Sequence, residues 1–144
     1  EYGLFESYQL DDAEVAIVVI NSAAGTAKDA IDQMRSEGKK VGLLKVRVFI
    51  PFPYAEMAEA LKNVKTIAVM DRAESFSSFG GPLFAETRSA LYDLASKPNI
   101  INYVYGLGGR DVRTNDIEFV FNELLAIKDG KEQGECYRYL GVRE

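Results

Sequence analysis

The chain has 144 residues, of which 47% are hydrophobic and 27% charged, and its formal net charge is −5. It contains no histidine and a single cysteine, Cys136, which excludes Ser-His and Cys-His nucleophile pairs, an internal disulfide, iron–sulfur clusters and zinc sites of the usual Cys/His kind. The length fits one domain, the acidity argues against nucleic-acid binding, and we expect a cytoplasmic location.

The first predicted strand is Val15–Ile20, a run rich in β-branched residues that is typical of a strand buried on both faces of a parallel sheet. This run is much shorter than the roughly 20 apolar residues of a membrane-spanning helix, so we expect no membrane segment. A helix follows and ends near Gly38. Its predicted inward face consists of Ala27, Ala30, Ile31 and Met34.

The same strand-then-helix unit recurs three times. The further strands are predicted over 40–49, 66–70 and 100–105. The helices after them begin near Pro53, at Pro82 and at Thr114, with Thr114 as the expected N-cap. Four such units predict an α/β domain with a mainly parallel sheet over residues 13–127.

The extensions 1–12 and 128–144 mix charges with scattered aromatic residues. Terminal segments of this kind often fray, but the aromatic residues favour docking, and we expect both extensions to dock on partner domains or subunits. The aromatic residues concerned are Tyr2, Phe5, Tyr8, Tyr137 and Tyr139.

Ligands and partners approach an open parallel sheet at the carboxyl ends of its strands. We therefore expect interface or loop-edge residues in the segments that follow the predicted strands. These residues are Asn21, Ser22, Thr26, Asp71, Arg72, Glu74, Arg110 and Asp111. The turns 21–26 and 106–111 lead into helix N-termini, which favour anions, but neither matches a phosphate-binding fingerprint. We interpret their glycines as tight turns and expect no catalytic, cofactor-binding or metal-binding residue in this chain.

Several short sequence motifs also point to a known family. They are GTAKDAI at 25–31 with RSEGKKVGLLKVR at 35–47 and PFP at 51–53, DRAES at 71–75 with FGGPLF at 79–84, and GLGGRD at 106–111. In this order and spacing they resemble the alpha subunit of the pyruvate:ferredoxin oxidoreductases, within the 2-oxoacid:ferredoxin oxidoreductase family, over residues 13–127.

The resemblance implies the second domain of that subunit, a three-layer α/β/α sandwich similar to the transketolase C-terminal domain, with an extra antiparallel edge strand. Enzymes of this family decarboxylate a 2-oxoacid on thiamine diphosphate with Mg, pass electrons through iron–sulfur clusters to ferredoxin, and transfer the acyl group to coenzyme A. Their catalytic groups lie in other domains and subunits. The resemblance thus implies a noncatalytic structural domain whose partners are the other domains and subunits of the complex, and ferredoxin at the level of the complex.

Two alternatives remain open from the sequence. One is a free-standing small-anion-binding or regulatory domain that uses Arg110 and the turn 21–26. The other is the equivalent domain of a 2-oxoacid dehydrogenase, which docks an acyltransferase instead of supplying electrons to ferredoxin. The sequence does not specify which 2-oxoacid the complex would use.

Overall fold

The structure is a computed structural model that describes residues 5–20, 23–47, 53–72, 81–106 and 112–140. Within them one six-stranded sheet has the order β1-β3-β2-β4-β5-β6. The strands are β1 (Phe5–Tyr8), β2 (Val15–Ile20), β3 (Val41–Val46), β4 (Thr66–Arg72), β5 (Asn99–Tyr105) and β6 (Tyr137–Tyr139). The helices are α1 (Ala23–Ser36), α2 (Tyr54–Leu61), α3 (Pro82–Leu91) and α4 (Thr114–Lys128).

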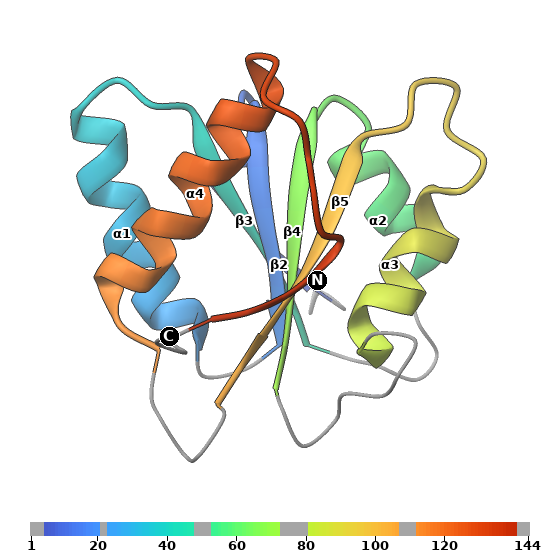
Figure 1. Cartoon of the computed structure of the whole chain (residues 1–144). Coiled ribbons are helices and arrows are strands. Elements are labelled where there is room, and N and C mark those ends of the chain that lie inside the picture. The colour runs from blue at the N-terminus through green and yellow to red at the C-terminus, as the bar shows by residue number, and fades with distance from the viewer. Residues whose placement is uncertain (1–4, 21–22, 48–52, 73–80, 107–111, 141–144) are drawn as a thin grey trace.

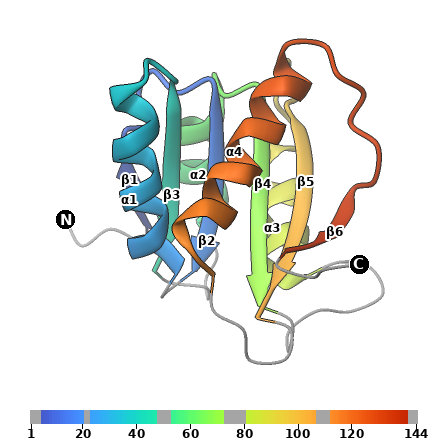
Figure 2. The same ribbon diagram turned by 60° about the vertical axis from the view of Figure 1, so that its left-hand side comes forward.

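The helices cover both faces of the sheet. Helices α1 and α4 lie on one face and α2 and α3 on the other, which makes three layers (Figures 1 and 2). Alternate residues of β2 therefore enter two different cores: Val15, Ile17 and Val19 pack with α1 and α4, whereas Ala16 and Val18 pack with α2 and α3. This double coverage is why the strand is a continuous apolar run, and it confirms the predicted α/β sandwich.

The two outermost strands come from the chain extensions. β1 pairs antiparallel with β3, and β6 pairs parallel with β5, so segments within 1–12 and 128–144 complete the sheet of this chain (Figure 2). The antiparallel edge strand that the family resemblance implies is thus β1. Whether either extension also docks on a partner stays a prediction.

Several predicted boundaries were wrong. Strand β3 covers Val41–Val46 and not 40–49, and β5 begins at Asn99 and not at residue 100. Strand β4 continues beyond residue 70 to Arg72, because Asp71 and Arg72 extend its parallel pairing with β5. Thr114 is the first residue of α4 and not its N-cap. The N-cap is Arg113, whose extended backbone (φ −110°, ψ 164°) directs its N–H to the Asp116 carboxylate at 3.0 Å. The acidic side chain at the third helical position thus accepts the backbone N–H of the N-cap residue, as the acidic residue of a capping box does.

Candidate functional site

The sequence places the candidate site at the carboxyl ends of the parallel strands. Of the eight predicted residues, Asn21, Ser22, Glu74, Arg110 and Asp111 lie outside the described residues. Thr26 is half-buried near the start of α1, and Arg72 is exposed at the end of β4 with its guanidinium 5.5 Å from the centroid of the Tyr105 ring.

Asp71 is the predicted residue that the structure describes most fully, and its side chain turns inward. It is 5% exposed, and its two carboxylate oxygens accept the backbone N–H groups of Leu83 at 3.0 Å and Phe84 at 3.2 Å. These N–H groups belong to the first turn of α3, where helix N-termini leave donors unsatisfied and favour a negative charge. The carboxylate of Asp71, on β4, thus provides the negative charge at this helix end. A capping side chain or a bound anion would otherwise fill that role.

Asn102 of β5 completes the arrangement. Its amide nitrogen donates to the Asp71 carboxylate and to the Val69 carbonyl, both at 3.0 Å, and its amide oxygen accepts the Gly81 N–H at 2.9 Å. Every strong hydrogen-bonding direction of this buried amide is used except one acceptor lone pair. Sequence reasoning missed Asn102; the signal was a single amide in the middle of the otherwise apolar and aromatic run 100–105.

Glycine is required at position 81, directly before α3, because a side chain there would have no room. A Cβ atom built there would lie 2.1 Å from Asp71 Cγ and 2.2 Å from Oδ2. The backbone of residue 81 must therefore pass against the carboxylate for α3 to receive its cap. We refer to Asp71, Gly81 and Asn102 as the α3 cap.

The electrostatics of the α3 cap are those of a structural carboxylate. Burial is the largest influence and raises the pKa of Asp71, while the hydrogen bonds from Leu83, Asn102 and Phe84 lower it in part. Because three N–H donors already occupy its oxygens, Asp71 has little capacity left to accept a proton from a substrate or to bind a metal. Among the described residues there is no cluster of three His, Cys, Asp or Glu side chains that could hold a metal ion.

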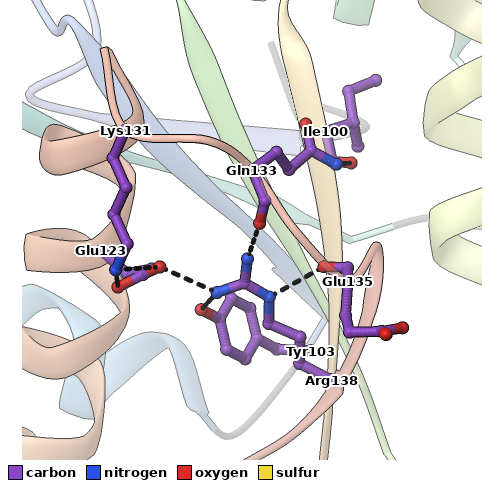
Figure 3. A network of polar contacts seen from close by, with 7 residues as sticks. All are labelled: Ile100, Tyr103, Glu123, Lys131, Gln133, Glu135 and Arg138. Atoms are coloured by element: carbon purple, nitrogen blue, oxygen red, sulfur yellow. Dashed lines mark hydrogen bonds and ion pairs between the residues drawn. The ribbon is translucent and has the colours of Figure 1, made fainter. Parts of the chain in front are cut away.

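A second polar cluster fixes the C-terminal extension to the domain (Figure 3). The Arg138 guanidinium donates to the Tyr103 hydroxyl at 3.1 Å, to the Glu123 carboxylate of α4 at 3.2 Å, and to the backbone carbonyls of Glu135 and Gln133. Lys131 also contacts Glu123, at 3.0 Å. We call Tyr103, Glu123, Lys131 and Arg138 the C-terminal clasp, since they join β6 to β5 and α4.

Cys136 lies beside this cluster and is a free, half-buried thiol. Burial raises its pKa, and Arg88 and Arg138 lower it in part. A thiol whose pKa is raised carries less thiolate, which is the reactive form. Burial therefore reduces the fraction of Cys136 that is present as thiolate.

No helix in the described part of the chain is long and apolar enough to cross a bilayer. The described residues form a layered domain in which the strand-end carboxylate of Asp71 is used internally, as the cap of α3.

The sequence has close relatives. A family model described as pyruvate:ferredoxin oxidoreductase core domain II matches residues 13–117. The chain is 40% identical to pyruvate synthase subunit PorA of Thermotoga maritima over 144 residues, which is 100% of this chain and 36% of that protein. It is 42% identical to ketoisovalerate oxidoreductase subunit VorA of Pyrococcus furiosus over 94% of this chain and 34% of that protein. It is also 42% identical to the alpha subunit of the NADH-dependent phenylglyoxylate dehydrogenase of Aromatoleum evansii, over 88% of this chain and 30% of that protein.

Solved structures show the same fold at low sequence identity. A 2-oxoglutarate:ferredoxin oxidoreductase from Magnetococcus marinus superposes with a TM-score of 0.61 at 18% identity, over 88% of this chain and 20% of that chain. A split-gene transketolase superposes with a TM-score of 0.65 at 14% identity, over 85% of this chain and 43% of that chain. The expected transketolase-like sandwich is confirmed.

The family model covers most of the chain, so the chain belongs to the pyruvate:ferredoxin oxidoreductase core domain II family, as its motifs indicated. It spans about a third of the length of the curated relatives it matches.

Proposed function

Because the chain belongs to this family, we propose that it is a structural and interface domain of the alpha subunit of a pyruvate:ferredoxin oxidoreductase (pyruvate synthase). The observation that carries the proposal is the 40% identity to a pyruvate synthase subunit over the whole chain. In the proposed reaction, pyruvate, coenzyme A and oxidised ferredoxin give acetyl-CoA, CO2 and reduced ferredoxin.

The geometry supports a noncatalytic part in that reaction. The buried carboxylate at the strand ends caps α3, and the described residues offer no metal-binding cluster. We place thiamine diphosphate, Mg and the iron–sulfur clusters of the complex in other domains and subunits. The described residues of this chain are proposed to position those parts, in a cytoplasmic complex.

The interface is proposed to include the carboxyl edge of the sheet. Arg72 is exposed there, and Arg110 follows β5 in the sequence. Arginine suits such contacts because its planar fork pairs with two carboxylate oxygens or carbonyls of a neighbour at once. We expect Arg110→Ala to lower the yield of assembled complex while the melting temperature of this chain stays unchanged. Lys40→Ala, at an exposed position before β3, is the matched control.

The choice of 2-oxoacid needs its own test. The relatives named for pyruvate, ketoisovalerate and phenylglyoxylate are 40%, 42% and 42% identical to this chain, so identity does not separate them. The assembled complex should be assayed with these three 2-oxoacids, with coenzyme A, and with ferredoxin or NAD as acceptor. Pyruvate with ferredoxin is expected to give the highest kcat/KM.

Copurification separates the remaining alternatives. An iron–sulfur-bearing partner supports the proposal, and a lipoyl-bearing partner would point to a 2-oxoacid dehydrogenase. Recovery of this chain without any partner, from cells that express the neighbouring subunits, would contradict the interface role.

A further inference from the structure

The two edge strands of the sheet differ in the burial of their aromatic residues. On β1, Phe5 and Tyr8 are half-buried and pack against the two cores. On β6, Tyr137 and Tyr139 are 39% and 55% exposed. Tyrosine is enriched at protein interfaces, where its ring is covered and its hydroxyl finds a polar partner. The exposed tyrosines of β6 therefore favour an interface at this edge of the sheet.

Strand β6 is also the outermost strand at its end of the sheet (Figure 2). Among the described residues its one neighbouring strand is β5, with which it pairs over three residues. An outermost strand presents backbone N–H and C=O groups that a further segment can cover. The one charged residue of β6 is Arg138, and its guanidinium is directed to Tyr103 and Glu123 in the C-terminal clasp. The edge thus presents tyrosine rings and backbone groups to its surroundings.

A hollow of about 530 Å³ lies beside β6. It is lined by Glu123 of α4, by the segment 131–135 and by the three residues of β6. The hollow gives a neighbouring segment room to insert a side chain next to the exposed tyrosines. We call β6 and this hollow the β6 surface.

The charges of the β6 surface specify which side chain fits. Lys131 and Arg138 both bind Glu123, at 3.0 and 3.2 Å. Glu132 and Glu135 are exposed and form no ion pair among the described residues. Figure 3 shows the Glu135 carboxylate turned away from the Arg138 guanidinium. The unpaired charges are thus both negative and lie beside tyrosine rings, and a basic side chain is attracted by carboxylates and by aromatic faces alike.

The length of the relatives indicates where such a side chain comes from. The chain spans 36% of the pyruvate synthase subunit of Thermotoga maritima and 34% of the ketoisovalerate oxidoreductase subunit of Pyrococcus furiosus. In a subunit of that length, the larger part of the polypeptide lies outside this domain and is joined to it covalently. Covalent linkage raises the effective concentration of a docking segment, so a segment of the same polypeptide binds in preference to a separate chain with equal contacts.

We infer that the β6 surface docks another segment of the same alpha subunit, which places an arginine or lysine against Glu132 and Glu135 and covers the rings of Tyr137 and Tyr139. This inference rests on the proposed function, which makes the chain part of an alpha subunit. It concerns the β6 edge of the sheet, whereas the proposed interface uses the carboxyl ends of the strands.

The test is hydroxyl-radical footprinting, read by mass spectrometry, on the whole alpha subunit that contains this chain, purified alone and within its complex. Tyr92 is the internal reference, because it is 72% exposed and does not line the hollow. In the alpha subunit alone, Tyr139 should be oxidised several-fold more slowly than Tyr92, a larger difference than their exposed fractions in this domain would give. Equal oxidation of the two tyrosines in both samples would overturn the inference. Protection of Tyr139 in the complex alone would also overturn it, since the occupant would then be a different subunit.

Charge reversal tests whether the docked segment is basic. Glu132→Lys/Glu135→Lys replaces two attractive charges by two repulsive ones. In the alpha subunit that carries both changes, the oxidation of Tyr139 should rise to nearly the rate of Tyr92. Protection of Tyr139 that survives the charge reversal would overturn the inference.

Asp11→Lys/Glu56→Lys is the matched control, because it makes the same change of charge at exposed positions that do not line the hollow. It should leave Tyr139 protected, and an equal loss of protection in this control would overturn the inference. Copurification of an iron–sulfur-bearing partner, which tests the proposed function, does not depend on the oxidation of Tyr139. The inference and the proposed function can therefore fail separately.

Discussion

Replacement of Asp71 by alanine tests whether the buried carboxylate is the cap of α3. The change removes the acceptor of two helix N–H groups and of one Asn102 N–H. A buried donor that loses its acceptor costs about 1–3 kcal/mol. Burial raises the pKa of Asp71, which means that the fold already opposes its charged form, so the lower end of the range applies. Three donors at about 1 kcal/mol each give an expected loss of about 3 kcal/mol.

This loss is a large part of the 5–15 kcal/mol that stabilises a typical domain. It corresponds to a decrease of about 10 °C in melting temperature for a domain of this size. Urea unfolding followed by circular dichroism measures it directly, as a lower midpoint with an unchanged slope. Asp71→Asn keeps the shape and one acceptor oxygen, and should lose about half as much.

Asp93→Ala is the matched control, because Asp93 is exposed shortly after α3 and should change stability by less than about 0.5 kcal/mol. A loss below about 1 kcal/mol for Asp71→Ala would refute the reasoning. It would show that the three N–H donors find water or other acceptors when the carboxylate is absent.

Three further predictions concern single sites. Gly81→Ala should destabilise the domain by about 2 kcal/mol in urea unfolding, because its Cβ would overlap Asp71; an unchanged midpoint would contradict the close approach. Thr87→Val should raise stability by about 1 kcal/mol, since the buried Thr87 hydroxyl has no partner among the described residues, and a lower melting temperature would reveal a partner. The pKa of Glu123 is lowered from 4.5, chiefly by its hydrogen bond with Lys131, so its stabilising contribution is present above pH 4.5 and is lost as the pH falls through the lower folded-state pKa. Amide exchange in β6 should therefore accelerate over that acidic interval more than exchange in β2.

Much of this fold is predictable because helices cover both faces of the sheet. The buried strands are therefore continuously apolar, and each helix carries one apolar stripe. The continuous apolar run of β2 and the helical stripe of α1 follow directly from burial on both sheet faces. The family resemblance implied an antiparallel edge strand but did not place it. The residue patterns of Phe5–Tyr8 and Tyr137–Tyr139 did not reveal β1 or β6, because both segments mix aromatic, charged and polar residues, as exposed edges allow. Their pairing is decided by the neighbouring strand and not by their own sequence.

The candidate site was predictable only in position. Asp71 was recognised as a strand-end residue, but the direction of its side chain depends on α3 and on Asn102, which is 31 residues away in sequence. Topology alone brings these groups together.

The α3 cap also affects the register in which β4 pairs with β5. In the observed pairing, Asn102 stands opposite Val69 and Asp71 opposite Val104. If β4 slipped by one residue against β5, Asp71 would turn to the other face of the sheet. There it would be a buried carboxylate surrounded by the α1 and α4 core, without its N–H donors, and such burial is strongly unfavourable. An apolar pair at these positions would tolerate the slip far better. The Asp71–Asn102 pair therefore fixes the register of β4 against β5.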